Sequence, residues 1–202
     1  MSNTRIERTP LAVSSCQRLS AAHAQRDRPA AVSDLAARHG NSLSMGPDMH
    51  DVVIRTALVS EQRPLEALQR RASLNNPGDR EALLANPDAI ELPLEQLERG
   101  SVFVAEVAGV LAGFAAVVPC DDGGAELDAL FVEPDMWRHG LGRLLVEHCA
   151  RVAYALGSVA LRVVGNPHAE GFYVACGFVV VGTMQTRFGP GLLMRKQLRQ
   201  PS

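Results

Sequence analysis

The chain has 202 residues, of which 47% are hydrophobic, which is enough for one domain with a full core and an appendage. Its 20 basic and 22 acidic residues leave a net charge of −2, whereas a nucleic-acid-binding protein normally carries a basic excess, so no nucleic-acid partner is expected. The four cysteines, Cys16, Cys120, Cys149 and Cys176, form no Cys-x-x-Cys pair, and no histidine pair has metal-ligand spacing. We therefore expect no metal site, no disulfide framework and the reduced thiols of a cytoplasmic protein.

Residues 1–50 differ in composition from the rest of the chain. They are rich in Ala, Ser and Arg and contain no sustained apolar run, which is typical of a disordered segment. They also lack the apolar core of a signal peptide. We expect a disordered N-terminal extension over 1–50, dispensable for catalysis up to about residue 48, and a single domain over 51–202.

Hydrophobic periodicity predicts a mixed α/β domain. Its expected elements, in chain order, are a strand 52–58, helices near 61–73 and 79–85, strands 101–107, 110–118 and 125–132, a helix 141–156, a strand 158–165, a helix 167–176 and strands 178–186 and 191–198. Gly189-Pro190-Gly191 is predicted to form the turn between the last two strands. The apolar segment 101–120 barely reaches the length of a membrane span, and its glycines favour two buried strands over a span. No membrane association is expected.

The run Trp137-Arg138-His139-Gly140-Leu141-Gly142-Arg143 places two glycines between a predicted strand and an amphipathic helix. Glycine lets backbone N–H groups approach an anion closely, and the N-terminus of the following helix favours negative charge. The loop therefore predicts a phosphate-binding site, with a glycine turn that only caps a helix as the alternative. It is not a dinucleotide-binding fingerprint, which needs a third glycine where Leu145 stands, nor a P-loop, which needs Lys-Ser/Thr after Gly142.

A second motif runs from Asn166 through Pro167, Ala169, Phe172 and Tyr173 to Gly177-Phe178. Asn is a good N-cap, Pro suits the first helical position and Gly suits the end, so the segment predicts a short helix. Together the two motifs resemble the GNAT superfamily of acyl-CoA-dependent N-acyltransferases over about residues 52–198. The match departs from the family at Trp137, where Gln or Arg is common.

This resemblance implies a mixed, mostly antiparallel sheet flanked by helices, in which one parallel strand pair splays apart to admit acetyl-CoA. It also implies cofactor-binding residues in both motifs and in the strand before the glycine loop. These are Leu130, Phe131, Val132, Arg138, His139, Gly140, Leu141, Gly142, Arg143, Asn166 and Tyr173.

Three side chains are candidates for catalysis. Glu126 and Asp128 are two residues apart on a predicted strand and so project to the same face, where a carboxylate can take a proton from an amine; the alternative is a pair of solvated charges. The resemblance assigns Tyr173 the role of proton donor to the CoA thiolate, with simple packing as its alternative. A backbone N–H within Leu130 to Val132 is implied for the oxyanion.

The sequence thus predicts an N-acyltransferase that moves an acetyl or short acyl group from acyl-CoA directly to a primary amine of a small molecule. A protein or peptide N-acetyltransferase is one alternative, and a non-catalytic acyl-CoA sensor is another. A homodimer formed near the last two strands is also an expectation.

Overall fold

The structure is a computed structural model that describes residues 51–86, 89–186 and 189–199. Its strands are β1 (Val52–Thr56), β2 (Val102–Val107), β3 (Val110–Pro119), β4 (Ala125–Val132), β5 (Ala160–Gly165), β6 (Val179–Thr186) and β7 (Gly189–Gln197). Its α-helices are α2 (Gln62–Asn75), α3 (Pro77–Ala85), α4 (Leu94–Glu98), α5 (Leu141–Ala155) and α6 (Glu170–Ala175). Short 3₁₀ helices are η2 (Val59–Glu61), η3 (Pro134–Met136) and η4 (Pro167–Ala169).

The strands form one seven-stranded sheet in the order β1-β2-β3-β4-β5-β7-β6. Every neighbouring pair is antiparallel except β4 and β5, which are parallel. This confirms the predicted mixed, mostly antiparallel sheet with one parallel pair and flanking helices. The helix α4, which the periodicity did not predict, follows Pro93 and is only five residues long.

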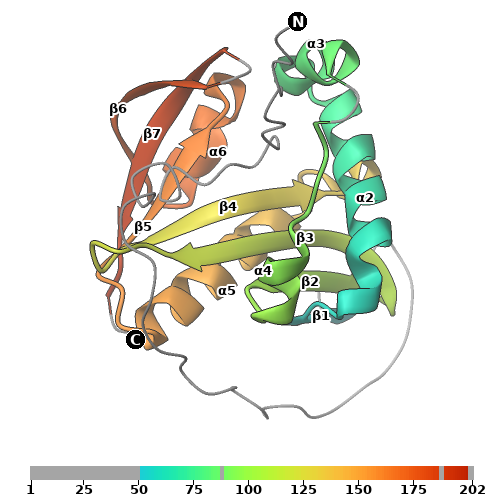
Figure 1. The fold of residues 1–202 in the computed structure, drawn as a ribbon, viewed down its shortest axis with the longest axis horizontal. Coiled ribbons are helices and arrows are strands. Elements are labelled where there is room, and N and C mark those ends of the chain that lie inside the picture. Colours follow the sequence, from blue (N-terminus) through green and yellow to red (C-terminus); the bar gives the residue numbers. More distant parts are fainter. Residues whose placement is uncertain (1–50, 87–88, 187–188, 200–202) are drawn as a thin grey trace, which may run out of the picture.

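Hydrophobic side chains form a core on each face of the sheet. On one face, α5 buries Leu141, Leu145 and Cys149 in a cluster that extends to Phe178 and Met194. On the other face, α2 and α4 cover a second cluster that contains Leu65, Leu68, Leu97 and Phe114. Figure 1 shows α5 behind the sheet and α2 and α4 in front of it.

The apolar segment 101–120 is a hairpin, as predicted. Ala108 and Gly109 have φ values of 50° and 76°, the left-handed conformation that a two-residue turn between twisted strands requires. Both strands are buried, which accounts for their apolar composition. Among the described residues, no helix is long and apolar enough to cross a membrane.

Two expectations are wrong. Gly189, Pro190 and Gly191 belong to strand β7 and pair with β6, so they do not form the turn. A Cβ on Gly191 would lie 2.7 Å from the side chain of Val164, so close strand packing explains that glycine. Cys120 is disulfide-bonded, contrary to the expected reduced thiols, whereas Cys149 and Cys176 are free as expected.

Candidate active site

The predicted phosphate loop joins the end of β4 to the start of α5. Gly140 is the N-cap of this 15-residue helix and has a φ of 86°, and Arg138 also adopts the left-handed conformation, with a φ of 66°. The first N–H groups of a helix have no intrahelical partner, and no side chain caps this one. The N–H groups of Leu141, Gly142 and Arg143 are therefore available to an anion at the positive end of the helix dipole.

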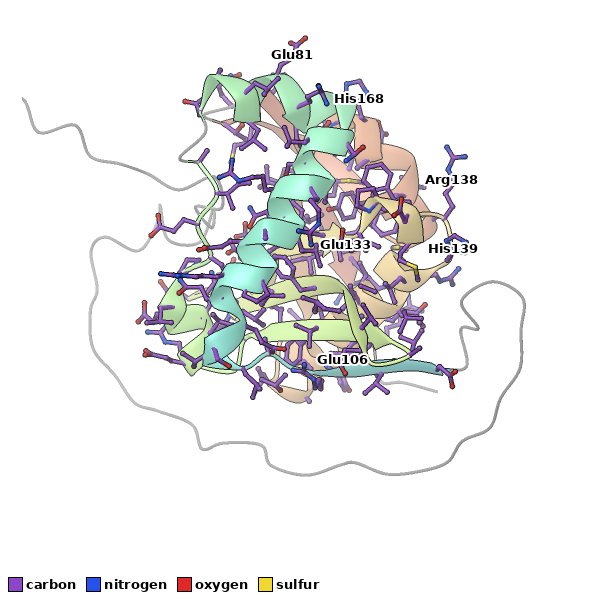
Figure 2. All side chains as sticks on the ribbon, turned by 90° about the vertical axis from the view of Figure 1, so that its right-hand side faces the viewer. Glu81, Glu106, Glu133, Arg138, His139 and His168 are labelled. Carbon is purple, nitrogen blue, oxygen red and sulfur yellow. The ribbon has the colours of Figure 1, made fainter. Side chains whose placement is uncertain are left out.

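The side chains of the loop offer less to an anion at this helix end than the backbone N–H groups do. Arg143 pairs with Glu147 one turn along α5, with 2.9 Å between Nε and Oε1. Figure 2 shows Arg138 and His139 at the outer edge of the loop. The Trp137 indole N–H donates to the Val132 carbonyl at 2.8 Å and so ties the loop to the end of β4. The departure at Trp137 therefore has a structural role.

Gly142 brings the two motifs into contact. A Cβ at this position would lie 3.3 Å from the ring of Phe172 and 3.8 Å from a methyl group of Val132. The first turn of α5 thus packs directly on α6. A side chain at Gly142 would press on the Phe172 ring, a contact that the sequence did not reveal.

Strands β4 and β5 separate after a short parallel pairing. Their parallel pairing comprises Ala125 with Leu161 and Glu126 with Arg162, and no later residue of β4 pairs with β5. Figure 1 shows the two strands diverging from this point. The edge of β4 from Leu127 to Val132, which includes the predicted oxyanion segment, is therefore not paired with β5.

The two predicted carboxylates lie at this divergence. Glu126, which is 4% exposed, belongs to the last parallel pair, and Asp128 lies two residues beyond it. Asp128 occupies an irregularity of β4: Leu127 and Ala129 have partners in β3, whereas Asp128 has none. The charge of Glu126 acts on Asp128, which is consistent with the predicted common face.

Asp128 has the more perturbed carboxyl group. Burial raises its pKa from 3.8 to about 6, and the charge of Glu126 also raises it, whereas a hydrogen bond from Gln96 opposes the shift. That bond, from Gln96 Nε2 to Asp128 Oδ2, is 2.7 Å long. Gln96 lies on α4 and is 5% exposed, and its Oε1 is a buried acceptor without a partner in the described part of the chain. The sequence did not identify Gln96, because α4 was not predicted.

Tyr173 is a buried residue of α6. Its ring packs edge-to-face on Phe178 and Phe172, with centroid distances of 5.6 and 5.1 Å. A Cβ on Gly165, the last residue of β5, would lie only 2.9 Å from the Tyr173 ring. Burial is the main cause that raises the pKa of Tyr173 well above its usual range, so the phenol is neutral at physiological pH. The described residues supply no hydrogen bond to its hydroxyl group.

Asn166 caps the segment that leads into α6, as predicted. Its Oδ1 accepts a hydrogen bond of 2.9 Å from the His168 N–H. Its Nδ2 donates at 2.8 Å to Asp79 on α3, a contact across 87 positions of the chain that the sequence did not indicate. Figure 2 places His168 beside α3.

Other candidate groups lie outside this arrangement. The His148 ring packs at a tilt on Phe103 with 4.6 Å between ring centroids, and burial lowers its pKa, so it is a core histidine. The residues that the structure describes contain no cluster of side chains able to hold a metal ion.

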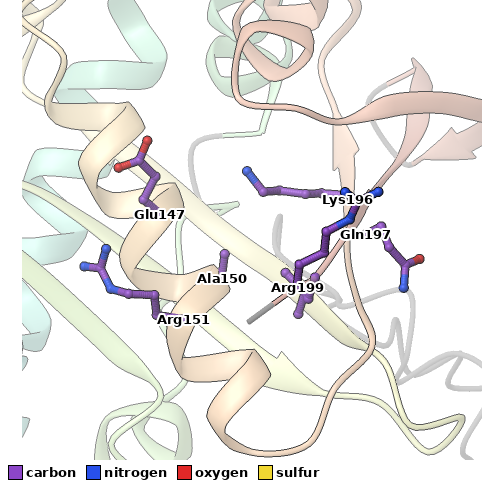
Figure 3. Close-up of a pocket in the computed structure, with 7 residues that line it drawn as sticks. Glu147, Ala150, Arg151, Lys196, Gln197 and Arg199 are labelled. Carbon is purple, nitrogen blue, oxygen red and sulfur yellow. The ribbon is translucent and has the colours of Figure 1, made fainter. Parts of the chain in front are cut away.

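An open pocket lies between the second half of α5 and the end of β7 (Figure 3), away from the glycine loop at the start of α5. Its volume is about 310 Å³, and it is lined by Glu147, Ala150, Arg151, Lys196, Gln197, Leu198 and Arg199.

The sheet splits at its one parallel pair, a glycine loop lies at the helix N-terminus beside the split, and a buried tyrosine lies on the opposite side of the split. These features define the acetyltransferase class that the two motifs resemble. The family model for the Acetyltransferase (GNAT) family matches residues 67–178, more than half of the chain. The chain belongs to this family.

Relatives agree with this assignment. The peptidyl-lysine N-acetyltransferase YjaB of Salmonella typhimurium is 41% identical over 59 residues, which are 29% of this chain and 39% of that protein. The chain therefore matches well under half the length of this curated relative. The PaiA N-acetyltransferase of Thermoplasma acidophilum, solved in complex with coenzyme A, has a TM-score of 0.58 at 19% identity, covering 72% of this chain and 98% of that one. YncA of Salmonella typhimurium, solved with its cofactor acetyl-CoA, has a TM-score of 0.55 at 20% identity, covering 75% and 96%. These two likenesses concern the fold.

Proposed function

We propose that the protein is an N-acetyltransferase that transfers an acetyl or short acyl group from acyl-CoA to a primary amine of a small molecule, within a ternary complex and without a metal. The observations that carry this proposal are a glycine loop at the uncapped N-terminus of α5, a β4 edge that is not paired with β5, and a protonated Tyr173 hydroxyl without a hydrogen bond from the described residues. Membership of the GNAT family supports it.

Acetyl-CoA fits the backbone groups around the split. The N–H groups of Gly140 to Arg143, with the loop residues Arg138 and His139, would hold the pyrophosphate. The unpaired edge of β4 at Leu130, Phe131 and Val132 would bind the pantetheine arm and place an N–H on the thioester oxygen, where negative charge develops during attack. Asn166 would contact the cofactor from the opposite side of the split.

The acceptor amine has to lose a proton before it can attack, because an ordinary alkylammonium has a pKa of about 10.4. Asp128 is the better candidate for the base. A pKa of about 6 leaves its carboxyl group ionised at neutral pH, and this pKa is closer to that of the amine than the pKa of an ordinary carboxyl group is. Glu126 would then act mainly through its charge. Breakdown of the tetrahedral intermediate re-forms the carbonyl group, breaks the C–S bond and releases the CoA thiolate, which takes the proton of the Tyr173 hydroxyl. The proton taken from the amine then passes from the base to solvent, and the Tyr173 phenolate regains a proton from solvent.

Tyr173→Phe tests the acid role. The substitution keeps the ring contacts with Phe172 and Phe178 and removes the proton, so kcat should fall about 10²-fold, the low end for general acid catalysis, while acetyl-CoA affinity is nearly unchanged. Tyr154→Phe on α5 is the matched control, because Tyr154 is 38% exposed and outside the site. A Tyr173→Phe enzyme with wild-type kcat, measured where chemistry limits the rate, would return Tyr173 to a packing role.

A peptidyl-lysine acceptor is the second candidate, supported by the 41% identity over 59 residues to the peptidyl-lysine N-acetyltransferase YjaB. Release of free CoA from acetyl-CoA, measured against small amines and against lysine-containing peptides, separates the two acceptor classes. The same assay tests the third possibility, a sensor that binds acyl-CoA without turnover. The presence of Tyr173 argues against a sensor, because a protein that only binds acyl-CoA needs no proton donor. Acetyl-CoA binding without CoA release for any amine would overturn the enzyme proposal.

The expected homodimer and the cytoplasmic location remain proposals. For the dimer, β6 is an edge strand of the sheet, and its residues Val179, Val180 and Val181 are 61%, 43% and 53% exposed. Exposed apolar edge strands favour pairing with another chain. Light scattering of the purified protein, compared with Val180→Glu, would measure the association.

A further inference from the structure

The carboxylate of Asp79 connects α3 to the segment that leads into α6, the helix that carries Tyr173. Asp79 lies in the first turn of α3 and is half-buried. Its Oδ2 accepts a 2.8 Å hydrogen bond from Asn76 Nδ2, and its Oδ1 accepts one of the same length from Asn166 Nδ2. Asp79 and Asn166 are thereby linked across the boundary between α3 and the second motif.

This contact determines how the Asn166 amide is turned. A carboxylate only accepts hydrogen bonds, so it holds the NH₂ end of the amide toward α3. The oxygen end is then left to accept the N–H of His168, at 2.9 Å, at the start of the segment that leads into α6. If the amide turned over, two acceptors would face each other at Asp79 and two donors at His168.

The same carboxylate lies within electrostatic reach of the catalytic candidate. The charge of Asp79 is the second cause, after burial, that raises the pKa of Tyr173, and Cys176 contributes after it. Burial also raises the pKa of Asp79, and the bonds from Asn166 and Asn76 and the charge of His168 oppose that rise. Thus Asp79, Asn166, His168 and Tyr173 form one connected group.

We propose that Asp79 is a positioning residue for acyl transfer: it orients the Asn166 amide, which caps the start of the segment that leads into α6, and so places the Tyr173 hydroxyl. The inference rests on the proposed function, because it gives Tyr173 the role of acid. Asp79 itself does not contact the reacting atoms in this mechanism.

An exchange of the two side chains tests the proposal. Asp79→Ala removes the acceptor and should lose about 10-fold or more in kcat with little change in the acetyl-CoA dissociation constant. Asn166→Asp sets two carboxylates against each other and should also lose about 10-fold or more in kcat. In the double variant Asp79→Asn/Asn166→Asp, the new amide at position 79 can donate to one oxygen of the new carboxylate at position 166 and accept from Asn76. The other oxygen of that carboxylate accepts from His168. Recovery of most of the lost kcat is expected. A folded double variant that stays as slow as Asn166→Asp would overturn the proposal.

Two further measurements exclude a merely structural effect. In a Tyr173→Phe background, Asp79→Ala should cause little additional loss of kcat, because the group that it positions is already missing. An undiminished loss would overturn the proposal. Glu81→Ala is the matched control on α3, since Glu81 is exposed and projects outward in Figure 2.

A readout without turnover separates this inference from the proposed function. The chain contains two tyrosines, so in Tyr154→Phe protein a ¹³C-tyrosine label reports on Tyr173 alone. Asp79→Ala should shift the ring resonance, and the exchanged pair should return it toward its original position. An unmoved resonance would refute the positioning role, whereas a shifted resonance in a protein that releases no CoA from any amine would refute only the proposed function.

Discussion

At the scale of single residues, the contact between Gly165 and Tyr173 shows how closely the site is packed. Gly165 ends β5, and the Tyr173 ring lies where its side chain would begin. No alternative residue can occupy this position without moving the ring, because even a methyl group would lie 2.9 Å from it. The place of the phenol is therefore set by a glycine that neither motif includes.

Gly165→Ala should lower the free energy of unfolding by about 1–3 kcal/mol, as overpacking in a core does, and should lower kcat by displacing Tyr173. Denaturant unfolding and steady-state kinetics measure the two effects. Gly182→Ala on β6 is the control, because nothing lies within 4 Å of a Cβ there. Wild-type kcat in Gly165→Ala would show that the position of the ring is not critical.

A second glycine prediction concerns cofactor binding. Gly142→Val should raise the acetyl-CoA dissociation constant, because the new side chain meets Phe172 and displaces the first turn of α5 from α6. Isothermal titration measures this change. Gly142→Val/Phe172→Leu should recover part of the affinity by making room for the valine. Unchanged affinity in a folded Gly142→Val protein would contradict the placement of the pyrophosphate at this helix end.

At the scale of elements, the short helix α4 sets the environment of the β4 carboxylates. Gln96 reaches from α4 to Asp128, at the position where β4 has an extra residue relative to β3. The bond favours the ionised carboxylate, whereas burial and Glu126 favour the protonated one, and the second influence is larger. The balance leaves Asp128 with a pKa in the range useful to a base.

This balance predicts opposite effects of Asp128→Asn on stability and activity. Because folding raises the pKa of Asp128 from 3.8 to about 6, the folded protein holds its proton where the unfolded chain has lost it, and stability falls as pH rises through this interval. At pH 7 the variant should be more stable than the wild type by about 1–3 kcal/mol, and this difference should vanish below about pH 4. Denaturant unfolding at several pH values measures it.

The activity of the same variant tests the base. Wild-type kcat/KM should rise with pH through an apparent pKa near 6, and Asp128→Asn should lose about 10²–10⁴-fold in kcat/KM at neutral pH. Glu126→Gln is the comparison, and it should lower the apparent pKa of the profile because it removes a neighbouring negative charge. A full loss in Glu126→Gln with none in Asp128→Asn would transfer the role of base to Glu126.

At the scale of the whole molecule, the described residues form one hydrophobic cluster on each face of the sheet, and these described parts of the clusters draw on positions 52 and later. The expectation for residues 1–50 concerns a part of the chain outside the described residues and stays a prediction.

A chain that begins at Met49 should keep acetyl-CoA affinity and the melting temperature of the full chain. Calorimetry and ligand titration supply the measurements. Loss of soluble folded protein would show that the first 48 residues pack on the domain.

The amino-acid sequence by itself determined the elements and the family. Local features suffice for this: the period of apolar residues, the glycines before α5, and the Asn-Pro start and Gly end of the second motif all act within a few residues. The strand and helix bounds agree with the structure to within a few residues for all the elements that were predicted. The helix α4 was not predicted, because five residues are too few to show a hydrophobic period.

Tertiary structure alone decided which side chains meet. The bonds from Gln96 to Asp128 and from Asn166 to Asp79 span 32 and 87 positions, and no pattern along the chain encodes such contacts. The raised pKa of Asp128 likewise depends on burial in the folded chain. Chain folding creates these environments because it removes water from groups that only the packed sheet and helices bring together.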